Sequence, residues 1–221
     1  MKQYSHILFD LDGTLTDPKE GIINSIQYAL NKYGIQKENH ELLHFIGPPL
    51  HKSFQEIFET EEKAFEAVDV YREYFSTKGK FENLLYKGIS ELLENLNKNN
   101  KTLFVATSKP TIFAEQILHH FNIHHHFKAV IGSNLDGTRT EKKDIIQEVI
   151  NQLPTINKQE MIMIGDRKFD VIGAKHFGID TISVLYGYGS LEELQLENPT
   201  YIVDEVSDLK KLLVRDLNKF K

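Results

Sequence analysis

The stretch Ile7-Leu8-Phe9-Asp10-Leu11-Asp12-Gly13-Thr14 joins a short apolar run directly to two aspartates and a glycine. The apolar run predicts a buried strand, and open parallel sheets bind ligands beyond the carboxyl ends of their strands. Aspartates two positions apart can converge on one ligand, and Gly13 permits a turn that aims backbone N–H groups inward. We therefore expect a phosphate site here, the structural alternative being an acidic turn that merely follows a strand.

Further short apolar runs follow this one, at residues 102–106, 129–131, 161–164, 181–185 and 201–203. Between and after them lie segments with helical apolar spacing, at 88–100, 111–122, 142–152, 169–177 and 207–220. Strands that alternate with helices form parallel sheets covered on both faces. The sequence therefore predicts an α/β fold with a doubly wound, Rossmann-like parallel sheet.

The segment from about residue 19 to 79 interrupts this alternation, because its apolar patterns are helical with no strand between them. Residues 22–30 and 65–75 each form an amphipathic face, and Gly47-Pro48-Pro49 predicts a bend between the two helices. We expect residues 16–80 to form a small all-helical inserted domain, and residues 1–15 and 81–221 to form the core.

A second acidic pair lies in Gly165-Asp166-Arg167-Lys168-Phe169-Asp170, directly after the predicted strand at 161–164. A helix would place Asp166 and Asp170 on one face, and clustered carboxylates suit Mg²⁺. The structural alternative is an acidic helix cap with an exposed partner four residues on.

Two further groups complete the pattern: Thr107-Ser108-Lys109 ends the predicted strand at 102–106, and Lys142 precedes a predicted helix. Alone, the hydroxyls suggest a turn and the lysine a solvated face. Their order along the chain, aspartates, hydroxyl, lysine and aspartates, is the informative feature, since most of these groups follow predicted strands.

This order of motifs resembles that of the haloacid dehalogenase-like hydrolase superfamily over nearly the whole chain, and the inserted helices resemble that superfamily's cap domain. The Phe45-Ile46-Gly47-Pro48-Pro49-Leu50 stretch is similar to phosphoglycolate phosphatase-like members. The resemblance implies that Asp10 is the nucleophile and that Asp12 is the acid and base. It also implies that Thr107 and Lys142 hold phosphoryl oxygens.

The resemblance further implies a Mg²⁺ cofactor bound by Asp10, the backbone carbonyl of Asp12 and Asp166. Asp170 is expected to orient Lys142 or a metal-bound water. We expect the substrate to contact Gly13, Thr107, Ser108 and Lys142 of the core and Gly47, His51 and Lys52 of the inserted segment. His51 and Lys52 could equally be solvated residues that open a helix.

The implied activity is hydrolysis of a small phosphate monoester through an aspartyl-phosphate. Phosphoglycolate and a nucleoside 5′-monophosphate are the two candidate substrates, and a sugar phosphomutase is an alternative enzyme. Both acidic motifs argue against a dehalogenase, and Leu50 stands where phosphonatases carry a lysine. A catalytically silent phosphate-binding module is the non-enzymatic alternative.

Composition and the length of the apolar runs argue against several other classes of protein. The formal net charge of −6 provides no basic field, so no nucleic-acid polymer is expected as a partner. The chain has no cysteine, which removes disulfides and thiolate chemistry. Its apolar runs are too short for a membrane span or a signal-peptide core. We expect a cytoplasmic monomer or homodimer without membrane contact.

Two other patterns have structural interpretations. Asn134-Leu135-Asp136-Gly137-Thr138 repeats the first motif with an amide in place of the nucleophile, so we interpret it as a loop that delivers Arg139 and Lys142. The histidines within residues 119–126 lie around a predicted helix end without matching carboxylates, so a solvated helix end is favoured over a metal site.

Overall fold

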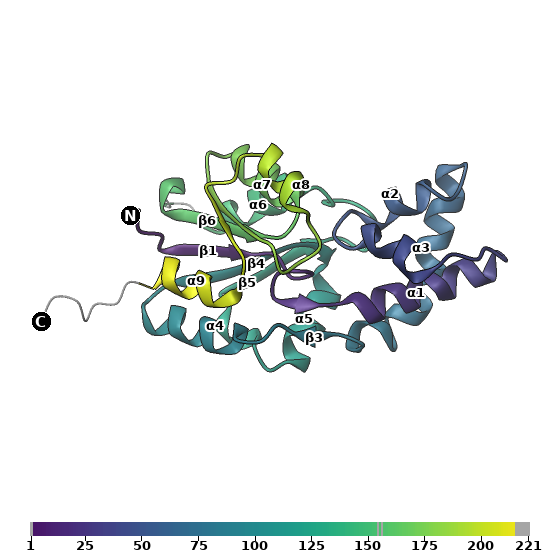
Figure 1. The fold of residues 1–221 in the computed structure, drawn as a ribbon, viewed down its shortest axis with the longest axis horizontal. Helices are drawn as coiled ribbons and strands as arrows, with labels where there is room; N and C mark the ends of the chain where they lie inside the picture. Colours follow the sequence, from purple (N-terminus) through teal and green to yellow (C-terminus); the bar gives the residue numbers. More distant parts are fainter. Residues whose placement is uncertain (1, 154, 156, 215–221) are drawn as a thin grey trace, which may run out of the picture.

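The computed structural model describes residues 2–153, 155 and 157–214, which are built around a six-stranded parallel sheet (Figure 1). The strand order is β5-β4-β1-β6-β7-β8, and every neighbouring pair is parallel. The strands are β1 (His6–Phe9), β4 (Thr102–Pro110), β5 (Ala129–Ser133), β6 (Met161–Gly165), β7 (Asp180–Val184) and β8 (Tyr201–Val203). All the predicted core strands are present, and the α/β fold is confirmed.

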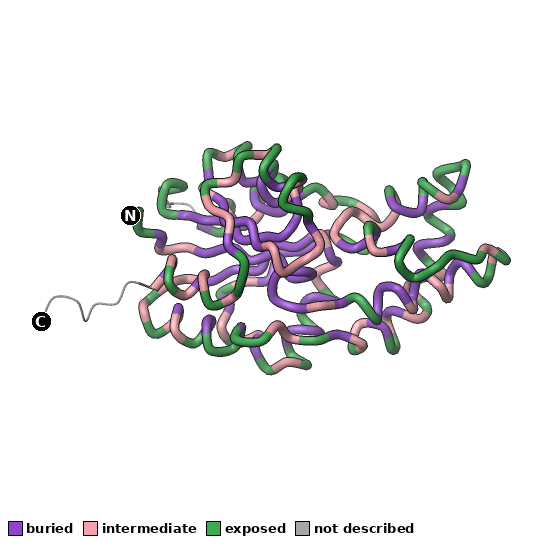
Figure 2. Tube along the Cα trace, viewed as in Figure 1, coloured by how far each residue is buried: buried purple, intermediate pink, exposed green. Residues whose placement is uncertain are grey.

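Helices cover both faces of this sheet because side chains alternate along each strand. Ile7 and Phe9 of β1 pack with α4 (Ile89–Lys98), α5 (Thr111–His120) and α9 (Val206–Leu213). Leu8 packs on the opposite face with α6 (Lys142–Asn151) and α7 (Lys168–Lys175). Figure 2 shows the strands as the buried centre between these layers. The part of the last predicted helix beyond residue 214 lies outside the described residues.

Short elements complete the core. These are helix α8 (Leu191–Leu196) and the 3₁₀ turns η3 (His124–His126) and η4 (Lys158–Glu160). The chain runs from β1 to β4 and β5 on one side, then returns to β6, β7 and β8 on the other. This reversal places the carboxyl ends of β1, β4 and β6 side by side, which is the position where doubly wound sheets bind ligands.

The inserted segment is helical, as its sequence predicts. It contains α1 (Lys19–Lys32), η1 (Asn39–Phe45), α2 (Leu50–Gln55), α3 (Glu61–Phe75) and η2 (Gly79–Phe81). The Thr60 hydroxyl caps α3 by accepting a hydrogen bond from Lys63 N, and the expected bend at residues 47–49 separates η1 from α2. In Figure 1 these helices lie beyond the carboxyl ends of the strands. We call residues 16–80 the cap.

A two-stranded antiparallel ribbon joins the cap to the core. It pairs β2 (Thr16–Asp17) with β3 (Leu84–Leu85), so both chain crossings lie side by side. Next to it, a Cβ on Gly21 would lie 1.8 Å from the carbonyl oxygen of Gly79, so the two crossings pack backbone against backbone. Strands of two residues carry too little periodicity for the sequence to predict them, and the exact division into core and cap stays a prediction.

Candidate active site

Asp10 and Asp12 lie in a tight turn after β1, at the centre of the sheet edge. Asp10 N still donates to Ile164 O of β6 at 2.8 Å, while Leu15 N and Thr16 N both donate to Leu11 O. Asp10 and Asp12 are 5% and 9% exposed, so both carboxylates are held in a largely water-free place.

Gly13 shapes the turn that carries the two aspartates. Its own N–H donates to Thr16 O within the turn. Gly13 has a φ of +79°, and a Cβ on it would lie 2.1 Å from Asp166 Oδ2. The glycine therefore lets the turn approach Asp166, because any side chain here would displace that carboxylate.

Lys142 joins the two acidic motifs. Its Nζ lies 3.0 Å from Asp10 Oδ1 and 2.7 Å from Asp170 Oδ1, and it donates to Ala106 O at 2.9 Å. Burial works to lower the pKa of Lys142, but the Asp10 and Asp170 carboxylates outweigh it and raise the pKa. The lysine is therefore a permanent, fixed cation at the first residue of α6.

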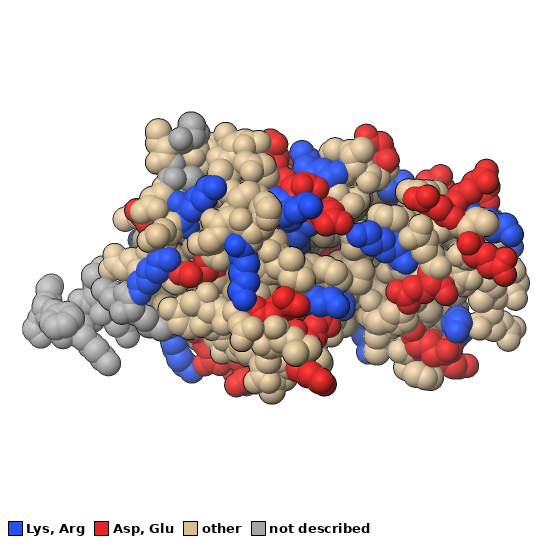
Figure 3. All heavy atoms as spheres, turned by 90° about the horizontal axis from the view of Figure 1, so that it is seen from above, with Lys and Arg blue, Asp and Glu red and all other residues tan. Residues whose placement is uncertain are grey.

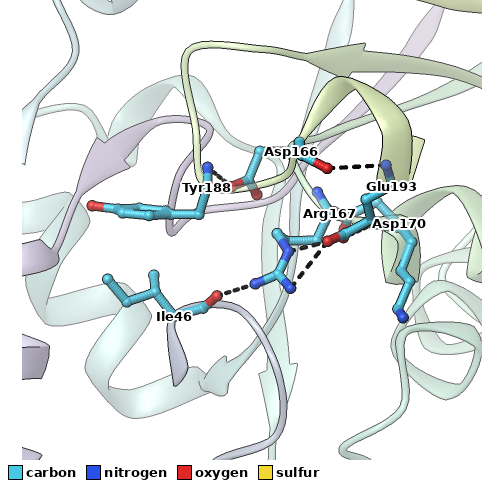
Figure 4. Close-up of polar contacts among 8 residues, drawn as sticks. Ile46, Asp166, Arg167, Asp170, Tyr188 and Glu193 are labelled. Atoms are coloured by element: carbon cyan, nitrogen blue, oxygen red, sulfur yellow. Dashed lines mark hydrogen bonds and ion pairs between the residues drawn. The ribbon is translucent and has the colours of Figure 1, made fainter. Parts of the chain in front are cut away.

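Asp10, Asp166 and Asp170 form a buried acidic cluster in which one oxygen of each lies within 4.8 Å of the others. Asp166 Oδ2 accepts from Tyr188 N at 2.7 Å (Figure 4), whereas Asp166 Oδ1 is buried without a hydrogen-bond partner among the described residues. Burial, then Asp170 and Asp10, raise the pKa of Asp166 well above its usual range. A divalent cation would satisfy this orphaned oxygen and offset the repulsion, so the residues fit Mg²⁺.

The Asp12 side chain does not join this cluster. Its Oδ2 lies 2.8 Å from Lys109 Nζ, and both side chains are buried. Burial raises the pKa of Asp12, while Lys109 opposes that change. A carboxylate separated from the acidic cluster is suited to proton transfer, and a metal ligand from this residue would have to be its backbone carbonyl, as the resemblance implies.

Lys109 is a site residue for which the sequence analysis predicted no role. Residues 107–110 extend β4 beyond the expected end, with a register shift after Ala106. Thr107 and Lys109 are both buried and Ser108 is half-buried, which is the two-residue alternation of a strand. This alternation is visible only in the structure, and the signal in the sequence was the position of Lys109 just after a predicted strand. Lys109 Nζ also lies 4.4 Å from the centre of the Phe75 ring in the cap.

A cavity of about 300 Å³ lies between this sheet edge and the cap. Asp10, Asp12, Thr107, Ser108 and Lys109 line it from the core, together with residues of the 133–140 loop. The cap contributes mainly apolar and aromatic side chains and two charged ones: Ile22, Phe45, Gly47, Pro48, Pro49, Leu50, His51, Phe65, Val68, Asp69, Tyr71, Arg72 and Phe75.

Of the three cap residues expected to contact substrate, two line the cavity and one does not. Gly47 and His51 line the cavity, and the His51 ring stacks parallel to Phe65 with centroids 5.4 Å apart. Burial, assisted by Lys52, lowers the pKa of His51, which favours a neutral ring. Lys52 is not part of the lining: its Nζ pairs with Glu141 at 3.0 Å across the cap–core boundary.

The 133–140 loop does more than the sequence analysis predicted. Arg139 donates through Nε to Gly132 O at 2.9 Å, and Lys142 follows the loop, as expected of a connecting segment. The loop also lines the cavity through Asn134, Asp136 and their neighbours. A Cβ on Gly137 would lie 3.6 Å from Phe65, so this loop faces the cap.

The histidines of the 119–126 segment contact one another through their rings, one pair stacked and the other tilted. His119 and His124 have centroids 4.0 Å apart, and His125 and His126 have centroids 4.1 Å apart. Within residues 2–153, 155 and 157–214, the group of three or more potential metal ligands is Asp10, Asp166 and Asp170. Helix α5 ends at His120, so these histidines lie at and after a helix end, as the sequence predicts.

Comparison with known proteins identifies the class. The haloacid dehalogenase-like hydrolase model matches residues 7–184, so the chain belongs to this family. A 5′-nucleotidase of Pseudomonas aeruginosa is 46% identical, with 96% of each chain covered. The tyrosine-protein kinase PtkA of Mycobacterium tuberculosis is 39% identical, covering 89% of this chain and 67% of that protein. The structure of a predicted phosphatase from Clostridium acetobutylicum superposes with a TM-score of 0.92 and 48% identity, covering 96% of this chain and 98% of that one.

The protein is therefore an enzyme, a phosphatase of the haloacid dehalogenase-like family that acts on small phosphorylated substrates. On the face shown in Figure 3, Lys and Arg are interspersed with Asp and Glu and form no continuous basic surface. Among the described residues, no helix combines the length and apolarity needed to cross a bilayer.

Proposed function

We propose that this protein is a Mg²⁺-dependent phosphatase that hydrolyses a nucleoside 5′-monophosphate through a phosphoryl group carried by Asp10. The observation that best supports this proposal is the position of Lys142, whose Nζ lies within 3.0 Å of both Asp10 and Asp170. Asp166 belongs to the same acidic cluster, and Asp10 lines the cavity. This arrangement supplies a nucleophile and a cation at one point. A dianionic phosphate ester could not approach a carboxylate without such a cation.

The contacts of Asp10 fit its role as nucleophile. Oδ1 accepts from Leu11 N at 2.7 Å and pairs with Lys142, and among the described residues Oδ2 has no such contact. In the first step Oδ2 bonds to phosphorus, the ester P–O bond breaks, and Asp12 donates its proton to the departing alkoxide. In the second, Asp12 takes a proton from water, the water oxygen bonds to phosphorus, and Asp10 leaves as a free carboxylate.

The charges explain why a metal is part of the proposal. When ionised, Asp10, Asp166 and Asp170 carry three negative charges against the one positive charge of Lys142. Asp10 and Asp166, with the Asp12 carbonyl, would hold Mg²⁺, which when bound neutralises charge and orients the phosphoryl group. Asp170 instead positions Lys142, at 2.7 Å from its Nζ.

The cavity supports the nucleotide over phosphoglycolate. Its volume of about 300 Å³ far exceeds the needs of a two-carbon acid, and its aromatic cap lining offers surface for a ring to stack. The 5′-nucleotidase relative supports the same choice. Phosphoglycolate and a sugar phosphomutase reaction remain the alternatives, and we keep the cytoplasmic location and the monomer or homodimer state as proposals.

A metabolite panel with Mg²⁺ tests this function. Purified protein should release phosphate from nucleoside 5′-monophosphates with a higher kcat/KM than from phosphoglycolate or sugar phosphates, and chelator should abolish release. Acid-quenched protein should retain label from a radioactively phosphorylated substrate, and Asp10→Asn should retain none. Full turnover in excess chelator would remove the metal from the mechanism, and a preference for phosphoglycolate would overturn the substrate.

A further inference from the structure

Arg167 lies between the two acidic residues of its motif and connects them physically to the cap. Its backbone N–H donates to Asp170 Oδ2 at 3.1 Å, which helps to fix the carboxylate that positions Lys142. Its side chain leaves this loop in another direction and reaches the cap (Figure 4). The side chain is buried, so its charge needs partners.

Those partners come from two distant parts of the chain. Nε and Nη2 donate to the two oxygens of Glu193 at 3.0 and 3.4 Å, and Nη1 donates to the backbone carbonyl of Ile46. Glu193 is itself fixed, because it also accepts from Lys168 N at 3.0 Å and its own N–H is capped by Ser190. Two parallel hydrogen bonds to Glu193 fix the orientation of the planar guanidinium, so its third donor, Nη1, is aimed at the carbonyl of Ile46.

Ile46 directly precedes the Gly47-Pro48-Pro49 bend, which lines the cavity. Ile46 is fully buried and Gly47 has a φ of +107°; a Cβ on Gly47 would lie 2.9 Å from Arg167 Cγ. The stem of Arg167 therefore packs on Gly47 while its tip holds the preceding carbonyl. Gly47 and the two prolines after it line the cavity, opposite the acidic residues.

We propose that Arg167 is a positioning residue that fixes the cavity-lining bend of the cap relative to the metal-binding carboxylates. It touches neither reacting atoms nor metal ligands through its side chain. Its contact with Ile46 O holds the bend in the position seen in this structure and connects it to the Asp166–Asp170 loop. A misplacement of such a bend by about 1 Å can cost roughly 100-fold in rate.

Hydrogen exchange and kinetics together test this role. Arg167→Met keeps the stem that packs on Gly47 but removes the three side-chain hydrogen bonds. Arg167→Lys keeps the charge but cannot bind both Glu193 and Ile46. The matched control is Lys168→Met, which changes the neighbouring cation outside this contact. The probe substrate is p-nitrophenyl phosphate with Mg²⁺, so the test does not depend on the proposed nucleotide specificity.

In Arg167→Met, amide exchange at residues 46–53 should rise at least about 10-fold while exchange in α1 stays as in wild type. KM should rise and kcat/KM should fall roughly 10- to 100-fold, and the Mg²⁺-induced increase in Tm should be retained because the Arg167 N–H is still present. Arg167→Lys should show the same raised amide exchange and lowered kcat/KM as Arg167→Met. Lys168→Met should match wild type in both measurements. Unchanged exchange at 46–53, an equal rise in α1, or loss of the Mg²⁺ effect would each overturn the proposal.

Discussion

Lys109 Nζ lies 2.8 Å from Asp12 Oδ2 in an ion pair whose side chains are 6% and 12% exposed. The pair connects the end of β4 to the turn after β1 and stands beside the cavity. Because neither charge has ready access to water, each depends on the other for compensation. Lys109 also contacts the Phe75 ring, so the same cation reaches the cap.

Removing this cation should destabilise the fold. We expect Lys109→Met to lower the free energy of unfolding by about 3 kcal/mol at neutral pH, because it leaves a buried carboxylate unpaired. The pKa of Asp12, already raised by burial, should rise further, so protonation relieves the penalty and the loss shrinks as the pH falls. Urea unfolding at several pH values measures this. The control is Lys98→Met, whose exposed pair with Glu94 is screened by water and should contribute little to stability. Equal losses in both variants would contradict the argument.

Asp10→Asn should abolish turnover while the fold remains intact. The amide is nearly isosteric with the carboxylate but lacks the negative charge that attacks phosphorus, so kcat should fall by roughly 10³-fold or more. Asp12→Asn should also lose most activity but accumulate labelled protein, because the hydrolytic water is no longer activated. Stopped-flow phosphate release and acid-quench labelling distinguish the two. Turnover by Asp10→Asn at a tenth of the wild-type rate would contradict covalent catalysis.

Stabilisation by Mg²⁺ should depend on pH. Burial first, and then the Asp10 charge, raise the pKa of Asp170 from 3.8 to about 6 despite the opposing Lys142, and Asp166 is raised as well. Protons therefore bind the folded state more tightly than the unfolded one, and this contribution to stability is lost as the pH rises from 3.8 through about 6.

Mg²⁺ would compete with protons for the Asp166 carboxylate and would be attracted by the neighbouring Asp170 charge. The increase in Tm on adding Mg²⁺ should therefore be largest above pH 6, where Asp170 is ionised, and shrink below it. Differential scanning calorimetry gives the Tm with Mg²⁺ and with chelator at each pH. Groups remote from the site affect both values equally, so the difference between them reports on the metal site. An increase that stays constant from about pH 8 to about pH 5 would place the metal elsewhere.

The aromatic stack in the cap should set substrate preference. His51→Ala and Phe65→Ala each remove one ring of a parallel pair that lines the cavity, so kcat/KM for a nucleoside 5′-monophosphate should fall roughly 10-fold. Phosphoglycolate has no ring to stack and should change less than about 2-fold. His40→Ala, an exposed histidine of the cap outside the cavity lining, is the control. Equal losses for both substrates would show that the rings maintain structure without selecting substrate.

The sequence by itself determined the core. Each core strand was visible as a short apolar run, and each acidic motif lay immediately after such a run, so strand ends and carboxylates could be placed without knowing any distant contact. Parallel connection then brings the ends of β1, β4 and β6 to one edge. Asp10, Asp166 and Asp170 come together for this reason, and Lys142, at the start of the helix after β5, reaches Asp10 and Asp170.

Only the tertiary structure decided which distant residues the buried charged side chains contact. Lys109 could be seen at the end of a strand, but its pairing with Asp12 depends on how β4 extends beside β1. Arg167 stood within a recognised motif, yet its contacts with Ile46 and Glu193 join segments that no local pattern relates. The same holds for the 133–140 loop and the ribbon of β2 and β3. Periodicity is a property of neighbouring residues, whereas a buried charge selects its partner from whatever packing places within reach.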